Sequence, residues 1–269
     1  MIAAIDQHHP LFDSAEYRRD AVAFDLLELI KQSPALLVSN EADFIVGMSA
    51  PAYPIWVWTR DAVSDSALAE LGEYLWAKTG HSKTFTFVAK PQAADALAAA
   101  LRKHGAATER RVRMESYANP RVTPPKNSAA DLQRPRPEDA PAIAACMAAF
   151  TTACFGTPAA AKDFLPVARQ RLALPYFFIV REEDAVAAMA QSTRETARHI
   201  AINMVYTRPA SRGKGYAAAL AAHLSCLILA AGKLPVLYAD LANPAANKAY
   251  RSVGFLPAGR VDEVTLTWP

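Results

Sequence analysis

The chain has 269 residues, of which 52% are hydrophobic and 20% charged, and its formal net charge is +3. This length accommodates two domains of ordinary size, and the composition supports a packed core rather than a disordered chain. The charge is too small to indicate nucleic acid or an anionic membrane surface as a partner. No apolar run approaches the ~20 residues that a membrane-spanning helix needs.

The N-terminus and the cysteines favour a reducing, cytoplasmic location. Residues 1–10 contain an acid and histidines instead of the basic start and apolar run of a secretion signal. The three cysteines, Cys146, Cys154 and Cys226, lack the spacing of a metal site or a redox pair. Because Cys146 and Cys154 have apolar neighbours, we expect both thiols to be buried, and we expect no metal site.

The first half of the chain alternates between helical and strand patterns. We expect helices over residues 16–31, 65–78 and 91–104, and strands over residues 35–38, 43–48, 55–59, 84–89 and 110–117. A segment with five prolines follows, over residues 119–137, which suits an extended connection. We therefore expect two domains, residues 1–125 and residues 126–269.

The second half predicts an α/β fold with a mixed, largely antiparallel central sheet flanked by helices. We expect strands over residues 132–136, 176–180, 185–192, 199–207, 236–239 and 261–267, and helices over residues 140–152, 159–172, 216–231 and 244–252. Both halves carry a three-stranded stretch, a helix, a strand, a second helix and a final strand. This order indicates a tandem of two similar domains, although no Gly-x-Gly precedes the helix that begins near Asp65.

The stretch that carries the chemistry links the strand ending at Tyr206 to the helix beginning at Tyr216. Between them, Gly213 and Gly215 allow a close approach of the backbone to a ligand, while Arg212 and Lys214 add positive charge. Unpaired N–H groups at a helix start bind anions. We expect a pyrophosphate to bind here.

Two known phosphate motifs fit this stretch poorly. A P-loop requires a hydroxyl residue after its lysine, but Gly215 follows Lys214. A dinucleotide fingerprint fits loosely as Gly213-x-Gly215-x-x-Ala218, with Asp240 at the end of the next strand. Spacing alone does not exclude it, but the motif follows a β-meander rather than opening a parallel βαβ unit, and few residues remain for further parallel strands.

A third pattern accounts for more residues. Arg212-x-x-Gly215-x-Ala217 resembles the Arg/Gln-x-x-Gly-x-Gly/Ala signature of the GNAT superfamily of acyl-CoA-dependent N-acetyltransferases. Asn243-x-x-Ala246-x-x-x-Tyr250-x-x-x-Gly254-Phe255 is similar to that superfamily's second signature, after its fifth strand. The resemblance covers roughly residues 131–269, and the first half is at most a degenerate GNAT-like domain.

The resemblance implies a site for acetyl-CoA as the acyl donor. The residues that it assigns to cofactor binding are Met204, Val205 and Tyr206 along the pantetheine arm, Arg212, Gly213, Lys214, Gly215, Tyr216 and Ala217 at the pyrophosphate, and Asn243 and Asn247 on the following helix.

Tyr250 matches the general acid of the family. A phenol with a pKa of about 10 can donate a proton to the departing thiolate, whose conjugate acid has a pKa of about 8.5. Many members place a glutamate on the fourth strand as the base, but residues 199–207 contain no carboxylate. His199, Glu195 and Asp240 lie near in sequence, and each suits a structural or exposed role better than catalysis.

The sequence therefore predicts an N-acetyltransferase that needs no metal and joins acetyl-CoA and an amine in a ternary complex. The acceptor is a small-molecule or peptide amine whose identity the sequence does not give. Three alternatives stay open: a non-catalytic CoA-binding or regulatory module, a nicotinamide oxidoreductase, and an acyltransferase that uses a longer acyl-CoA.

Overall fold

The computed structural model describes residues 1–79, 82–125 and 130–268, which form two compact units. The first unit comprises Met1–Ser116, Ala239–Ala242 and the end of the chain from Pro257 onward. The second comprises Tyr117–Tyr238 and Asn243–Leu256. Each unit is described separately.

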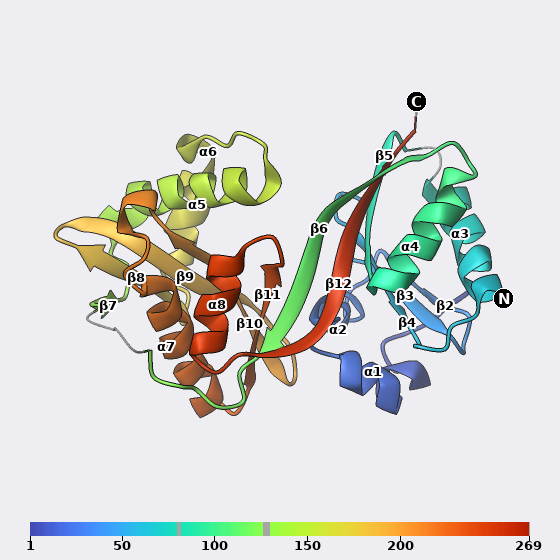
Figure 1. The fold of residues 1–269 in the computed structure, drawn as a ribbon, viewed down its shortest axis with the longest axis horizontal. Coiled ribbons are helices and arrows are strands. Elements are labelled where there is room, and N and C mark those ends of the chain that lie inside the picture. Colours follow the sequence, from blue (N-terminus) through green and yellow to red (C-terminus); the bar gives the residue numbers. More distant parts are fainter. Residues whose placement is uncertain (80–81, 126–129, 269) are drawn as a thin grey trace. The chain divides into compact units, whose positions relative to one another are not determined.

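The first unit is a sheet with the strand order β1-β2-β3-β4-β5-β12 and with β6 beside β12 (Figure 1). Its strands are β1 (Ala3–Ala4), β2 (Leu36–Ser39), β3 (Phe44–Met48), β4 (Ile55–Thr59), β5 (Thr84–Ala89), β6 (Ala107–Ala118) and β12 (Leu256–Thr267). Its helices are η1 (Pro10–Asp13), α1 (Ala15–Asp20), α2 (Asp25–Ile30), α3 (Asp65–Thr79) and α4 (Pro91–Arg102). Neighbours from β1 to β4 are antiparallel, β4 and β5 are parallel, and β12 is antiparallel to β5.

The second unit has the strand order β7-β8-β9-β10-β11. Its strands are β7 (Leu132–Gln133), β8 (Phe177–Glu182), β9 (Ala185–Glu195), β10 (His199–Thr207) and β11 (Leu234–Asp240). Its helices are η2 (Pro137–Asp139), α5 (Ala140–Phe155), α6 (Ala161–Arg171), η3 (Pro209–Ser211), α7 (Tyr216–Ala230) and α8 (Pro244–Ser252). Neighbours from β7 to β10 are antiparallel, and β10 and β11 are parallel.

The two halves of the chain repeat one plan, which confirms the predicted fold class, and β12, the last strand of the second half, belongs to the first unit. In each, two helices follow the first strand, a three-stranded antiparallel stretch comes next, and a helix links the fourth strand to a parallel fifth. A shorter helix and a long last strand complete the plan. The repeat explains why both halves of the sequence give the same pattern of elements.

Helices cover both faces of the sheet in the second unit. Phe177 and Ile179 on β8 join a core with Ile143 and Met147 of α5. The intervening Phe178 contacts His223 of α7 instead, with ring centroids 4.4 Å apart. Since alternate side chains of a strand point to opposite faces, α5 and α7 lie on opposite sides. The same alternation explains why β8 reads as a continuous apolar run.

Two local predictions are wrong, and one strand was not predicted. The helix expected over residues 16–31 is two short helices, because the chain turns at residues 21–24 and Phe24 packs edge-on against Trp56. Residues 3–4, for which the sequence predicts no element, form β1, which pairs with β2. Cys146 is buried as expected, but Cys154, near the end of α5, is exposed.

The last strand shows how pairing across long sequence distances escapes a sequence pattern. Residues 261–267 are predicted as the end of the second domain, whereas Asp262–Thr267 of β12 pairs with residues 84–89 of β5. The predicted boundary between residues 125 and 126 adjoins residues 126–129, which lie outside the described residues, and the two-domain division stays a prediction.

Gly254 fixes how the segment after β6 meets the end of α8. Its φ is +103°, and a Cβ built there would lie 2.2 Å from the carbonyl oxygen of Arg121 and 2.9 Å from Oδ1 of Asn119. Asn119 is fully buried and donates from Nδ2 to the carbonyl of Val253 at 3.1 Å, while Thr123 N–H donates to the same carbonyl at 3.0 Å. Only glycine fits this backbone crossing.

We expect Gly254→Ala to destabilise the protein by about 2 kcal/mol or more, because the added methyl group must push a backbone carbonyl away. Gly232→Ala is the matched control, since Gly232 also has a positive φ (+74°) but open space around its Cβ position. Urea or thermal unfolding of both variants measures the difference. Equal losses in the two variants would contradict the crowding at Gly254.

Candidate functional site

Strand β10 separates from β11 after a short parallel ladder. The ladder pairs His199, Ile200 and Ala201 with Leu234, Pro235 and Val236. Beyond Ala201, β10 pairs only with β9 in the described part of the chain. One edge of β10 therefore carries backbone N–H and C=O groups that a ligand could pair with.

A β-bulge lies on the separated part of β10. The register with β9 shifts between Asn203 and Tyr206, and Met204 has a φ of +55°, which is uncommon for a residue other than glycine. The side chains of Met204 and Tyr206 pack against the core beneath α5 and α6. The structure thus places the predicted residues 204–206 at the irregular segment where strand pairing is interrupted.

The segment over residues 211–216, here called the glycine loop, leads directly into α7. Gly213 has a φ of +82°, and Gly215 has a φ of +83° and is the N-cap residue of α7. A glycine cap has no side chain to accept the first N–H groups of the helix, which have no intrahelical partner either. The N-terminus of α7 therefore offers open N–H groups of the kind that bind anions, and the pyrophosphate site predicted here stays a prediction.

Glu182, the last residue of β8, accepts three hydrogen bonds from the glycine loop. Lys214 Nζ donates to Oε1 at 2.5 Å, Tyr216 OH donates to Oε1 at 2.6 Å, and Ser211 Oγ donates to Oε2 at 2.6 Å. These bonds, from Lys214 first, then Ser211 and Tyr216, lower the pKa of Glu182 from its ordinary 4.5 to about 2. In return the carboxylate raises the pKa of both Lys214 and Tyr216. We call these four residues the Glu182 cluster.

The two predicted cations of the loop are in different situations. The ammonium of Lys214 is paired with Glu182, so much of its charge is already balanced. Arg212 is exposed, and its Nε donates to the carbonyl of Thr207 at 3.3 Å. This bond ties Arg212 to the end of β10, beside the bulged segment.

Asn243 and Asn247 lie on the first turns of α8. Asn243 is the N-cap, and its side chain accepts from the N–H of Ala246 at 3.1 Å. Asn247 donates from Nδ2 to the carbonyl of Asn243 at 2.7 Å and accepts from Tyr117 OH at 2.8 Å. Both amides therefore hold the start of α8 in place, and Asn243 is also exposed.

Tyr250 lies on the same helix, one or two turns later. Its side chain is 7% exposed and packs edge-on against Phe255, with ring centroids 5.9 Å apart. Burial, and secondarily the nearby Cys154, raises the pKa of the Tyr250 phenol well above its ordinary value. The hydroxyl therefore stays protonated at neutral pH, which a proton donor requires.

The residues considered for a base have structural contacts. Glu195 forms an ion pair with Lys233 at 3.3 Å. Oδ1 of Asp240 accepts from the N–H of Ala242 at 2.8 Å, which closes the turn after β11. His199 is buried at the start of β10, and its N–H donates to Thr196 Oγ1 at 2.9 Å. Among the described residues, no group of three or more His, Cys, Asp or Glu side chains is arranged to hold a metal ion.

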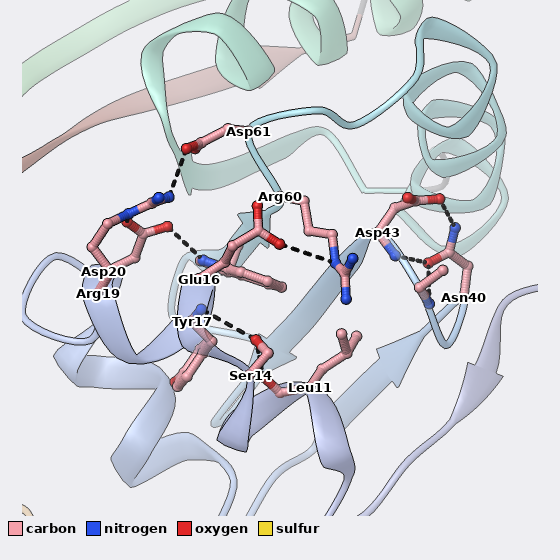
Figure 2. A network of polar contacts seen from close by, with 12 residues as sticks. Leu11, Ser14, Glu16, Tyr17, Arg19, Asp20, Asn40, Asp43, Arg60 and Asp61 are labelled. Carbon is pink, nitrogen blue, oxygen red and sulfur yellow. Dashed lines mark hydrogen bonds and ion pairs between the residues drawn. The ribbon is translucent and has the colours of Figure 1, made fainter.

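The corresponding loop of the first unit is built differently. Helix α3 is capped by Ser64, whose Oγ accepts from the N–H of Ala67 at 3.2 Å, so a side chain occupies the position where a phosphate would bind. Arg60 and Asp61, which follow β4, form ion pairs with Glu16 and Arg19 of α1 at 3.4 and 2.6 Å (Figure 2).

The Arg19–Asp61 ion pair borders a cavity of about 400 Å³ in the first unit, lined by Arg19, Asp20, Phe24, Asp61, Lys90 and Arg260 among others. Lys90 Nζ forms ion pairs with the two acidic residues of this lining, at 2.5 Å from Asp20 and 2.8 Å from Asp61. The charges therefore neutralise one another, and the loop lacks the glycines of its counterpart.

The structure thus brings Ser211, Lys214 and Tyr216 together around Glu182, and it places Asn243, Asn247 and Tyr250 along α8. Sequence analysis missed Glu182 and Ser211, because Glu182 stands in an acidic stretch that predicts an ordinary turn. Ser211 and Glu182 are 29 residues apart in the chain, and no local sequence pattern indicates that their side chains form a hydrogen bond.

Comparisons with known proteins agree with this arrangement. Residues 146–255 match the model of the Acetyltransferase (GNAT) family. These residues form a GNAT acetyltransferase domain. The match contains the glycine loop, Asn243, Tyr250 and Gly254. No curated protein matches the sequence significantly.

Solved structures extend the GNAT-like fold to the first half of the chain. A GCN5-related N-acetyltransferase from Sphaerobacter thermophilus aligns with a TM-score of 0.64 at 16% identity, covering 98% of this chain and 94% of its own. One from Kribbella flavida gives 0.61 at 15%, covering 95% and 97%. An acetyltransferase from the GNAT family of Colwellia psychrerythraea gives 0.56 at 13%, covering 100% of both chains. The predicted GNAT-like character of both halves is confirmed at the level of fold.

One sequence argument against a dinucleotide site is wrong. The motif follows a β-meander, but β10, α7 and β11 do form a parallel strand–helix–strand unit. A dinucleotide site is now disfavoured by the match of residues 146–255 to the GNAT family.

Among the described residues, no helix combines the length and the apolar composition needed to cross a membrane.

The Glu182 cluster gives a pH dependence of stability. The folded-state pKa of about 2 lies below the ordinary 4.5, so ionised Glu182 stabilises the fold above about pH 4.5, and this contribution is lost as the pH falls towards 2. We expect Glu182→Gln to lower the urea midpoint at pH 7, with a deficit that shrinks between pH 4.5 and 2. Glu183→Gln, an exposed neighbour, corrects for net charge. A deficit independent of pH would contradict the assignment.

Proposed function

We propose that the second unit transfers an acetyl group from acetyl-CoA to a small-molecule or peptide amine in a ternary complex. The match to the GNAT family supports acyl transfer as the class of reaction. The observation that carries the finer proposal is the glycine-capped N-terminus of α7, directly after the bulged end of β10. An anion site next to an unpaired strand edge suits a ligand with a pyrophosphate and an amide-containing arm.

In this proposal each end of the cofactor meets backbone groups. The N–H groups from Gly213 to Ala217 bind the pyrophosphate, with help from Arg212. The backbone of residues 204–206 pairs with the amides of the pantetheine arm, as an added strand would. Asn243 and Asn247 hold the start of α8 beside the pantetheine arm, so their main role in this proposal is to position the helix.

The chemical step joins the amine to the acetyl group without a covalent enzyme intermediate. The nitrogen lone pair attacks the thioester carbonyl carbon, the resulting tetrahedral intermediate expels the sulfur, and the nitrogen loses a proton. Tyr250 donates its hydroxyl proton or a hydrogen bond to the departing thiolate. Because its pKa is raised, it must regain any proton it gives, and the proton released by the nitrogen balances this transfer.

No carboxylate of β10 serves as the base, and the residues near it have structural contacts. The amine therefore enters neutral or loses its proton through water. The proposal requires no metal ion and includes a cytoplasmic location, which rests on the sequence alone.

The burial of Tyr250 favours a second candidate function. A tyrosine that is 7% exposed and stacked edge-on against Phe255 could serve only to pack α8 on the sheet. The protein would then be a CoA-binding or regulatory module without catalysis. The two functions share the cofactor and differ in turnover.

Cofactor binding is tested by thermal shift with acetyl-CoA, CoA, NAD and no ligand. A ligand at 100 times its Kd should stabilise the fold by about 2.7 kcal/mol, so we expect acetyl-CoA and CoA, but not NAD, to raise Tm. Gly215→Glu should abolish the shift, because its side chain and charge occupy the phosphate position. Gly232→Glu, at the other end of α7, is the control. A shift with NAD alone would overturn the proposal.

Catalysis is tested by Tyr250→Phe, which keeps the ring packing and removes the hydroxyl. We expect kcat to fall about 10²-fold or more with little change in acetyl-CoA affinity, in line with the usual contribution of general acid catalysis. Tyr176→Phe, at a half-buried tyrosine directly before β8, is the control. Wild-type turnover in Tyr250→Phe would remove the acid role and favour a packing role.

A further inference from the structure

The glycine loop contains two residues whose type has unusually large conformational freedom in the unfolded or unbound chain. Gly213 and Gly215 both adopt a positive φ, and both are exposed. Glycine loses more conformational freedom on ordering than any other residue. A loop that binds a ligand through its own N–H groups must hold them in one geometry, so disorder at these two residues reduces affinity directly.

Glu182 holds the loop on both sides of each glycine. Ser211 precedes Gly213, Lys214 stands between the two glycines, and Tyr216 follows Gly215. All three bond to the one carboxylate at 2.5 to 2.6 Å. Hydrogen bonds to an ionised acceptor are roughly twice as strong as neutral ones. Each flexible residue is therefore flanked by two fixed ones.

The carboxylate itself is fixed by the sheet. Glu182 is the last residue of β8 and pairs with Ala185 at the start of β9. Its side chain is 28% exposed, and Ser211 is 5% exposed, so part of the cluster is shielded from water. The loop is thus anchored to a rigid strand pair rather than to another loop.

Simple electrostatics predicts the opposite effect of this residue on an anionic ligand. A carboxylate beside a pyrophosphate site repels the ligand, and here it also neutralises Lys214, one of the loop's two cations. If repulsion dominated, removing Glu182 would strengthen binding. The sign of the change therefore distinguishes anchoring from repulsion.

We propose that Glu182 is a positioning residue that pre-orders the glycine loop for the pyrophosphate of the cofactor, at a small electrostatic cost. Its role in affinity rests on the proposed function, because it assumes that acetyl-CoA binds at this loop. Lys214 then serves the site mainly by bonding to Glu182, and Arg212 and the backbone N–H groups carry the direct attraction.

Two measurements on Glu182→Ala, Glu182→Gln and wild type test this inference. Hydrogen–deuterium exchange without ligand should accelerate in Glu182→Ala most strongly at the amides of residues 211–217, beyond the smaller increase elsewhere that follows from the lower stability of the variant. Titration calorimetry should show acetyl-CoA binding weakened about tenfold in Glu182→Ala and less in Glu182→Gln, whose amide oxygen can still accept hydrogen bonds. Glu183→Gln removes the same charge one residue away and should leave exchange unchanged.

The outcomes separate the inference from the proposed function. Unchanged loop exchange in Glu182→Ala would overturn the anchoring, and tighter acetyl-CoA binding in that variant would show that repulsion dominates and overturn it too. If wild type bound no acetyl-CoA while Glu182→Ala exchanged faster, the proposed cofactor would fail but the anchoring of the loop would stand.

Discussion

The candidate site depends on where the parallel pairing of β10 and β11 ends. Three residue pairs hold the strands together, and beyond them β10 contains a bulge against β9 in which Met204 is left-handed. Backbone groups without strand partners are costly unless water or a ligand satisfies them. The separation therefore leaves one edge of β10 without a strand partner beyond Ala201 among the described residues, and this is the edge that the proposal assigns to the pantetheine arm. The glycine loop and α7 start a few residues later, which places the proposed anion site at the end of that edge.

Charge is used sparingly in this site. In the proposed function, attraction for a pyrophosphate comes largely from the start of a helix, whose N–H groups are fixed by the fold and carry no net charge. Glu182 carries the same sign of charge as such a ligand, and we propose that its three hydrogen bonds order the loop. Ordering of the loop strengthens the binding of an anion, and repulsion by the carboxylate weakens it. The net effect of Glu182 on affinity depends on which of the two is larger.

The two units show how one plan can keep or lose such a site. In both, a helix links parallel fourth and fifth strands. The helix of the second unit begins with Gly215, which leaves its first N–H groups open, whereas the helix of the first begins with Ser64, whose hydroxyl occupies that position. Ion pairs from α1 fix the loop before Ser64 (Figure 2). The two copies thus differ in cap residue and in loop charge at the position where we propose that the second copy binds its cofactor.

The sequence by itself determined most of the elements, the repeated order of helices and strands, and the residues of both GNAT signatures. These features are local, because apolar spacing, the positions of glycine and proline, and each of the two motifs can be recognised within a short stretch of sequence. The structure alone decided the pairing of β12 with β5, the crossing of Arg121 over Gly254 and the bonds from Ser211, Lys214 and Tyr216 to Glu182. Each of these joins residues far apart in the chain. Such contacts follow from how strands and loops pack in space, and an acidic turn such as residues 182–184 looks the same whether or not it has a partner.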